Sequence, residues 1–154
     1  MRAKILVVED DTQLLEILRS YLKAVGFAVA TATNGIEALK KARSVSPDLV
    51  LLDLVLPELD GLAVYDTLRK GPRTTSVPII IVTGLPSGLA RCAGLADGPG
   101  DIVSKPVNPK HLVAKINDLL RQTRGASSAP KVEKSKCSRL QGGHRRGQPT
   151  LAQN

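Results

Sequence analysis

Short runs of aliphatic residues alternate with amphipathic stretches through the first 124 residues, and this alternation constrains the fold more than any other feature. The short runs are rich in valine and isoleucine, which is typical of strands buried on both faces. The stretches between them repeat their apolar residues every three or four positions, as amphipathic helices do. Strands that alternate with helices form a parallel sheet covered on both faces, so the sequence predicts a doubly wound α/β fold. Five strands are expected, at residues 4–8, 27–31, 48–53, 77–82 and 102–104.

Capping residues predict where the helices begin and end. Thr12 is expected to cap the first helix, and Gly26 is expected to end it at the C′ position. Asn34 should open the second helix, residues 61–70 should form the third, and Asn108 should cap the last.

The positive charge of the chain is concentrated near its end. The formal net charge is +8, and residues 1–124 hold 16 Lys and Arg against 13 Asp and Glu. Residues 125–154 hold six Lys and Arg against one Glu, with few large aliphatic residues and many Gly, Pro, Ser and Gln. Such a composition cannot offset the entropy cost of folding. We therefore expect a folded domain at 1–124 and a basic, disordered tail at 125–154, which could attract nucleic acid weakly and non-specifically.

The sequence also excludes several classes of protein. Its apolar runs are shorter than the roughly 18–20 residues of a membrane-spanning helix, and its first residues do not resemble a secretory signal. A soluble, cytoplasmic protein without membrane contact is expected. The two cysteines, Cys92 and Cys137, are too few and too far apart for a disulfide scaffold or a structural zinc site. Gly-rich nucleotide-binding motifs are absent, so nucleotide turnover is not expected.

Charged and polar residues occur where the predicted strands end. The first strand runs directly into Glu9 and Asp10, the third ends at Asp53, the fourth at Thr83 and the fifth at Lys105. Ligands of parallel α/β sheets bind at the carboxyl ends of the strands. We therefore expect these side chains to lie at one rim of the sheet.

These residue types favour phosphoryl transfer with a divalent cation. Clustered carboxylates repel one another unless positive charge lies among them, and oxygen ligands suit Mg²⁺. Asp53 could attack phosphorus and form an aspartyl phosphate. Thr83 could donate a hydrogen bond to the phosphoryl oxygens, and Lys105 could pair with them.

Five segments resemble the receiver domain of two-component response regulators, in the same order and at matching intervals. The resemblance covers about residues 3–122. It implies a flavodoxin-like sheet of order 2-1-3-4-5 and a cis peptide between Lys105 and Pro106. The matching segments are residues 4–11, 48–57, 60–61, 81–84 and 104–106.

The resemblance also implies an activity and its partners. Asp53 would accept phosphate from a sensor histidine kinase or phosphotransfer protein, while Glu9, Asp10, Asp53 and the backbone carbonyl of Val55 surround Mg²⁺. The chain would catalyse its own aspartyl phosphorylation and slow dephosphorylation, without being a dedicated metabolic enzyme. The residues after Arg124 are too poor in apolar side chains for a helix-turn-helix, so output through a downstream protein target is expected.

Two other functions are compatible with parts of this pattern. A phosphorylation-independent interaction domain would keep the fold without the switch. A haloacid-type phosphatase also has an aspartate nucleophile at a strand end, but it needs a second aspartate two residues later, where this chain has Val55.

Some positions depart from the receiver pattern. Ile102 stands where receivers usually have an aromatic residue, and it cannot present a ring that moves between buried and exposed states. Val55 and Leu85 replace polar residues that orient the hydrolytic water, which predicts slow self-dephosphorylation. Glycines and prolines between residues 86 and 100 predict a weakened fourth helix. Asp11 is expected at a turn or helix N-terminus rather than on the metal.

Overall fold

The computed structural model describes residues 2–84 and 100–125. Five strands form one sheet in the order β2-β1-β3-β4-β5, and every neighbouring pair is parallel. The predicted doubly wound α/β fold and its strand order are therefore confirmed. The strands are β1 (Lys4–Val8), β2 (Ala28–Ala32), β3 (Leu49–Asp53), β4 (Ile79–Thr83) and β5 (Gly100–Ser104).

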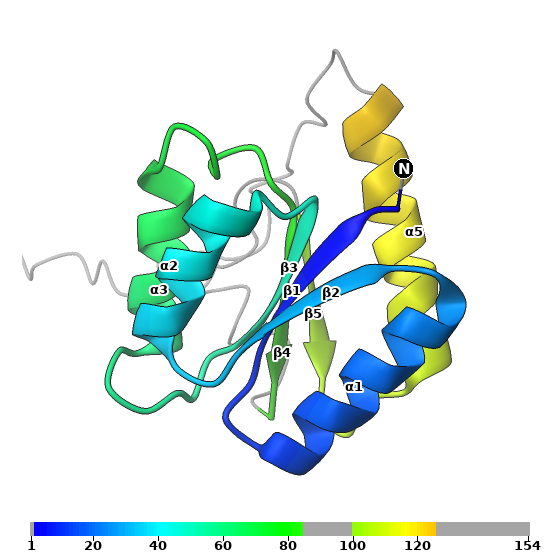
Figure 1. Cartoon of the computed structure of the whole chain (residues 1–154), viewed down its shortest axis with the longest axis horizontal. Coiled ribbons are helices and arrows are strands. Elements are labelled where there is room, and N and C mark those ends of the chain that lie inside the picture. The colour runs from blue at the N-terminus through cyan, green and yellow to red at the C-terminus, as the bar shows by residue number, and fades with distance from the viewer. Residues whose placement is uncertain (1, 85–99, 126–154) are drawn as a thin grey trace, which may run out of the picture.

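Helices cover both faces of the sheet (Figure 1). α1 (Thr12–Val25) and α5 (Pro109–Gly125) lie on one face, and α2 (Gly35–Val45) and α3 (Gly61–Lys70) lie on the other. The weakened fourth helix was predicted for a segment that lies almost entirely outside the described residues. Among the helices that the structure does describe, none is long and apolar enough to cross a bilayer.

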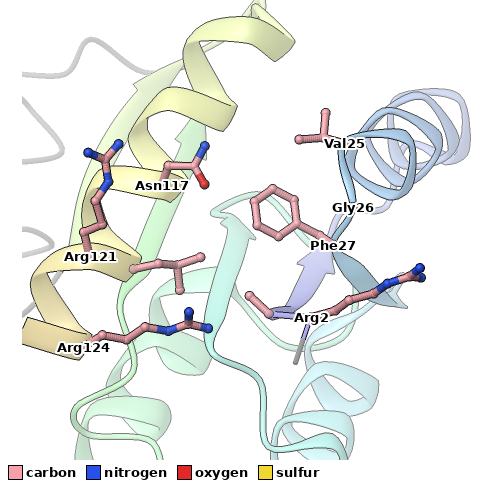
Figure 2. A pocket seen from close by; sticks show the side chains of 9 residues that line it. Arg2, Val25, Gly26, Phe27, Asn117, Arg121 and Arg124 are labelled. Carbon is pink, nitrogen blue, oxygen red and sulfur yellow. The ribbon is translucent and has the colours of Figure 1, made fainter.

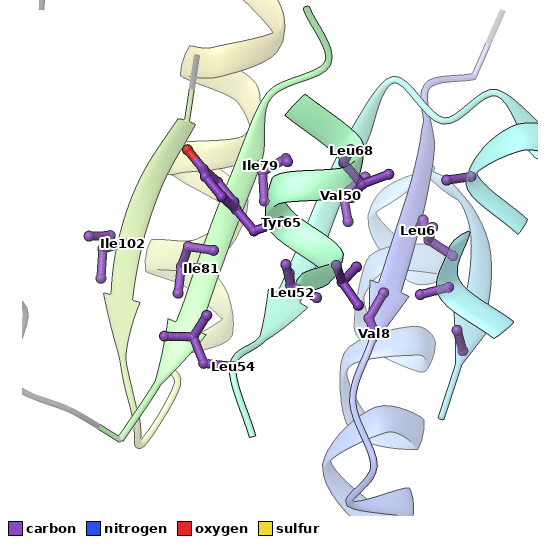
Figure 3. Close-up of a cluster of buried hydrophobic side chains, with 14 residues drawn as sticks. Leu6, Val8, Val50, Leu52, Leu54, Tyr65, Leu68, Ile79, Ile81 and Ile102 are labelled. Atoms are coloured by element: carbon purple, nitrogen blue, oxygen red, sulfur yellow. The ribbon is translucent and has the colours of Figure 1, made fainter. Parts of the chain in front are cut away.

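The sheet separates two hydrophobic clusters. Successive side chains of a strand point to opposite faces, so Ile5 and Val7 pack toward α1 and α5, while Leu6 and Val8 pack toward α2 and α3. Figure 3 shows the second cluster, in which Tyr65 of α3 lies over the strands. Full burial of one such aliphatic side chain contributes about 1.5–3 kcal/mol. The clusters hold the strand ends in fixed positions.

The helix termini agree with the sequence except at α1. Asp11, not Thr12, caps α1, since its Oδ1 accepts hydrogen bonds from two first-turn backbone N–H groups at 3.0 and 3.3 Å. The Asp11 carboxylate satisfies these free donors and interacts favourably with the positive end of the helix dipole. The cap therefore lies one residue earlier than predicted. Asn34 and Asn108 accept from the first turns of α2 and α5 as predicted. Gly26 ends α1 in the left-handed region, at φ 115°.

Candidate functional site

The carboxyl ends of the strands bring the predicted site residues to one rim of the sheet. Glu9 follows β1, Asp53 ends β3, Thr83 ends β4 and Lys105 follows β5. The strand register pairs Asp53 with Val82, the neighbour of Thr83. Thr83 is 1 % exposed, so its hydroxyl belongs to the interior of this rim.

Three carboxylates form a compact cluster at the rim. Glu9, Asp10 and Asp53 each place a carboxylate oxygen within 4.8 Å of the others. Glu9 and Asp53 are buried, while Asp10 is exposed, so the cluster meets solvent on the Asp10 side. Carboxylate oxygens at this spacing fit a hard divalent cation such as Mg²⁺. Asp11 lies outside this set, at the helix N-terminus where its carboxylate caps α1.

Lys105 supplies positive charge to the cluster. Its Nζ lies 3.1 Å from Asp53 Oδ2 and 3.2 Å from Glu9 Oε2. Burial opposes the charged form, but the hydrogen bonds to Asp53 and Glu9 raise the pKa of Lys105, so the ammonium stays charged. The backbone N–H of Lys105 donates to the Thr83 carbonyl at 2.8 Å, and the peptide between Lys105 and Pro106 is cis, as expected.

The electrostatics of the cluster are most evident at Glu9. Burial raises the pKa of Glu9 to about 7, and the neighbouring Asp53 carboxylate adds to this rise. The backbone N–H of Asp11, 3.2 Å from Glu9 Oε1, and the Lys105 ammonium act in the opposite direction. One ammonium thus only partly compensates three carboxylates, so the site favours additional positive charge, whether a proton or a metal ion.

Close backbone packing positions the loop that follows Asp53. The Val55 N–H donates to Asp53 Oδ1 at 3.1 Å, and the Gly61 N–H donates to the Leu54 carbonyl at 3.2 Å. A Cβ on Gly61 would lie 2.5 Å from both the Asp53 carbonyl oxygen and Leu54 Cα. Only glycine allows α3 to begin against this loop. The sequence suggested no more than a turn at Asp60 and Gly61, because no local pattern indicates a contact with the preceding strand.

Replacing Gly61 with alanine is expected to lower the free energy of unfolding by about 1–3 kcal/mol, since the new methyl group must displace backbone next to Asp53. Urea denaturation followed by circular dichroism measures the change. Gly84→Ala is the control, because a Cβ at that position has no described atom within 4 Å. Equal losses in both variants would contradict this account of the packing.

The fold and the strand-end cluster agree with a comparison of known families. Residues 5–117 match the response regulator receiver domain. The chain belongs to the response regulator receiver family. This receiver is similar to a probable transcriptional regulator, ycf27, of Pyropia yezoensis, with 44% identity over 121 residues. The match covers 79% of this chain and 49% of that protein. It is 35% identical to the alkaline phosphatase synthesis transcriptional regulatory protein PhoP of Bacillus subtilis, covering 86% of this chain and 55% of the relative. The receiver chain thus spans about half the length of these curated relatives.

Solved receiver structures agree with the same assignment. A CheY-like receiver domain protein from Methanospirillum hungatei superposes with a TM-score of 0.75 at 30% identity, covering 81% of this chain and 98% of that one. The chemotaxis response regulator CheY4 of Vibrio cholerae gives a TM-score of 0.72 at 28% identity, covering 77% and 99% of the two chains. The family also supports two-component signalling as the usual role of such a domain.

The positions that depart from the receiver pattern differ in their burial. Ile102 is 5% exposed and belongs to the cluster that contains Tyr65 and Ile81, so its side chain is part of the core (Figure 3). Val55 is 72% exposed and follows Asp53 by two residues, and its backbone N–H donates to Asp53 Oδ1. Leu85 lies outside the described residues. The site therefore has an apolar side chain at the first of the two positions expected to orient water.

Proposed function

We propose that this receiver accepts a phosphoryl group on Asp53 from a sensor histidine kinase or phosphotransfer protein in the cytoplasm. The observation that carries the proposal is the environment of the Asp53 carboxylate. Oδ1 accepts a hydrogen bond from the Val55 N–H, while Oδ2 contacts the Lys105 ammonium. The Asp53 side chain is thus held in position and lies beside the Lys105 ammonium. A nucleophile that attacks an anionic phosphoryl group requires both this positioning and this positive charge.

The proposed transfer balances as a substitution at phosphorus. A carboxylate oxygen of Asp53 bonds to phosphorus while the P–N bond of phosphohistidine breaks. The imidazole keeps the electron pair and takes up a proton. Lys105 then pairs with a phosphoryl oxygen in place of the carboxylate oxygen, and the Thr83 hydroxyl donates a hydrogen bond to the phosphoryl group.

We assign the metal site of the proposed reaction to Glu9, Asp10, Asp53 and the backbone carbonyl of Val55. Their oxygen donors suit Mg²⁺, which when bound neutralises negative charge on the nucleophile and the phosphoryl oxygens. The exposed position of Asp10 leaves a solvent-facing route to the cluster. The other two carboxylates are buried and held by Lys105.

The proposal is tested with acetyl phosphate as a small phosphoryl donor. In the presence of Mg²⁺, intact mass spectrometry should detect one addition of about 80 Da, the mass of a phosphoryl group. Chelating the metal with EDTA should prevent the addition. A chain that stays unmodified with Mg²⁺ and acetyl phosphate would overturn the proposal.

Binding of Mg²⁺ is expected to weaken as the pH falls, because the ion requires the ionised form of Glu9. With the pKa of Glu9 near 7 in the metal-free protein, binding at pH 6 must displace a proton. The dissociation constant should be about tenfold larger at pH 6 than at pH 8. Calorimetry in two buffers of different ionisation enthalpy should count nearly one proton released per ion at pH 6.

The control for this titration is Glu9→Gln, which cannot lose a proton. Its affinity for Mg²⁺ should be lower overall but nearly constant between pH 6 and 8. The metal-free wild type should also lose stability as the pH rises from 4.5 to about 7, since the folded state holds the Glu9 proton more tightly than the unfolded state. A wild-type affinity that does not change over this range would contradict the assignment.

The phosphorylated state is expected to be long-lived, because the apolar Val55 does not orient an attacking water. Val55→Asn should shorten the lifetime of phospho-Asp53 by roughly tenfold, equivalent to about 1.4 kcal/mol in the barrier. Loss of the mass adduct with time measures the lifetime. Val55→Ala is the size control and should change it little. Acceleration by alanine but not by asparagine would contradict the explanation.

A phosphorylation-independent interaction domain is the second candidate, and the burial of Ile102 favours it. In that case the amide NMR spectrum of the phosphorylated protein would differ from that of the unmodified protein only near Asp53.

For either function we propose that residues 1–124 form the receiver and that output passes through contacts with a downstream protein. The basic residues of 125–154 would add weak, salt-sensitive attraction to nucleic acid.

A further inference from the structure

The short loop between β1 and α1 carries two of the three carboxylates of the rim. Glu9 and Asp10 lie in this loop, and Asp11 ends it as the N-cap of α1. The loop is anchored at its start, where the Glu9 N–H donates to the Ala32 carbonyl at 3.0 Å. Its other end leaves the sheet, so the conformation there depends on how the chain enters α1.

Asp11 fixes that end of the loop with both its side chain and its backbone. Its Oδ1 accepts hydrogen bonds from the Gln13 and Leu14 N–H groups at 3.0 and 3.3 Å, and its carbonyl accepts from the Leu15 N–H at 2.9 Å. These bonds hold Asp11 at φ −71° and ψ 106°, the extended conformation of an N-cap residue. The peptide group between Asp10 and Asp11 is therefore held in one orientation.

This peptide group contacts the Glu9 carboxylate directly. The Asp11 N–H donates to Glu9 Oε1 at 3.2 Å, while Glu9 Oε2 lies 3.2 Å from the Lys105 ammonium. Each oxygen of the buried carboxylate thus has its own partner. Lysine is a point charge on a flexible chain, whereas the peptide N–H is a fixed donor. The peptide N–H therefore determines the direction in which the Glu9 carboxylate points.

The Asp11 carboxylate itself is directed to the helix and not to the cluster. Among residues 2–84 and 100–125, the carboxylates whose oxygens lie within 4.8 Å of one another are those of Glu9, Asp10 and Asp53. We propose that Asp11 is a positioning residue of the magnesium site, whose cap on α1 holds the peptide N–H that orients Glu9. The inference rests on the metal ligands assigned above. A ligand that is oriented before the ion arrives loses less conformational freedom on binding, so the cap strengthens binding of Mg²⁺.

The test compares two variants that lose the same charge. Asparagine caps a helix about as well as aspartate, whereas alanine does not. Asp11→Asn should bind Mg²⁺ within about twofold of the wild-type affinity at pH 8, because it loses only an exposed, screened charge. Asp11→Ala should bind Mg²⁺ about tenfold more weakly than Asp11→Asn, because Glu9 is no longer held. Calorimetry on the full chain measures both affinities.

NMR of the metal-free protein supplies a second readout. The temperature coefficient of the amide proton at residue 11 reports on its hydrogen bond to Glu9. The coefficient should be small in the wild type and in Asp11→Asn, and large in Asp11→Ala. An unchanged coefficient in Asp11→Ala would overturn the inference without any measurement of metal binding.

Gly26→Ala is the matched control for the stability of α1. Gly26 ends the same helix at the opposite end of the sheet, where it lines a pocket between the end of α1 and α5 (Figure 2). Its φ of 115° disfavours a side chain, while a Cβ there would have no described atom within 4 Å. Gly26→Ala and Asp11→Ala should each lower Tm by about 2–8 °C, but only Asp11→Ala should weaken binding of Mg²⁺.

The possible failures of the inference and of the proposed function are distinguishable. A wild type that binds no Mg²⁺ would refute the metal site and the role of Asp11 together. Equal affinities of Asp11→Asn and Asp11→Ala, in a protein whose wild type binds the ion, would overturn the positioning role alone. Equal weakening by Gly26→Ala and Asp11→Ala would also overturn it, because the cap would then act only through the stability of the helix.

Discussion

Asp53→Asn is expected to abolish the phosphoryl adduct while leaving the fold intact. The amide matches the carboxylate in size, and its oxygen can still accept the Lys105 hydrogen bond, so the packing of β3 is kept. An amide oxygen is a far weaker nucleophile than a carboxylate, and the neighbouring Glu9 and Asp10 carboxylates are assigned to the metal ion. Intact mass spectrometry after incubation with Mg²⁺ and acetyl phosphate should therefore detect only the unmodified variant.

The matched control is Asp66→Asn, an exposed position on α3 outside the carboxylate cluster. This variant should gain one phosphoryl group at the wild-type rate. Thermal denaturation should show that both variants fold. A phosphoryl adduct on Asp53→Asn would assign the nucleophile to another residue and contradict the proposed chemistry.

Lys105→Met is expected to separate metal binding from phosphoryl transfer. Methionine approximates the length of lysine but removes the ammonium that contacts Asp53 and Glu9. The rate of phosphorylation should fall about a hundredfold, because a positioned charge at the phosphoryl group contributes roughly 3 kcal/mol to the transition state. Affinity for Mg²⁺ at pH 8 should be equal or higher, since the cluster becomes more negative.

Calorimetry with Mg²⁺ and a time course of acetyl phosphate labelling measure the two effects on the same sample. Lys110→Met changes an exposed lysine near the start of α5 and should affect neither quantity. Parallel loss of metal binding and labelling in Lys105→Met would mean that the lysine only maintains the structure of the rim.

The sequence predicted the strands well because their burial leaves a clear local signal. Ile79, Ile80 and Ile81 are consecutive, β-branched and all buried, a pattern typical of a strand between two layers. The order of the strands has no such signal and came from the resemblance to receivers. The start of β5 was predicted two residues late, because Gly100 was assigned to the glycine-rich segment of the fourth helix, whereas it pairs with Ile79.

The candidate site was predictable because each of its residues directly adjoins a strand end. The same reasoning could not find the pocket between the end of α1 and α5, since its lining residues Arg2, Phe27 and Arg124 come from distant segments without a shared motif. It also missed the packing of Gly61 against the loop after Asp53. Such contacts depend on how two secondary-structure elements pack against each other, and no local sequence pattern indicates that packing.

The strand order places the carboxylates of the rim on inner strands and the lysine next to an edge strand. Glu9 and Asp53 adjoin β1 and β3, which have neighbours on both sides, whereas Lys105 follows β5 at the margin of the sheet. Marginal strands detach at lower free energy than central ones. Local opening of β5 would therefore remove the ammonium from the rim while Glu9 and Asp53 stayed in place beside the central strands.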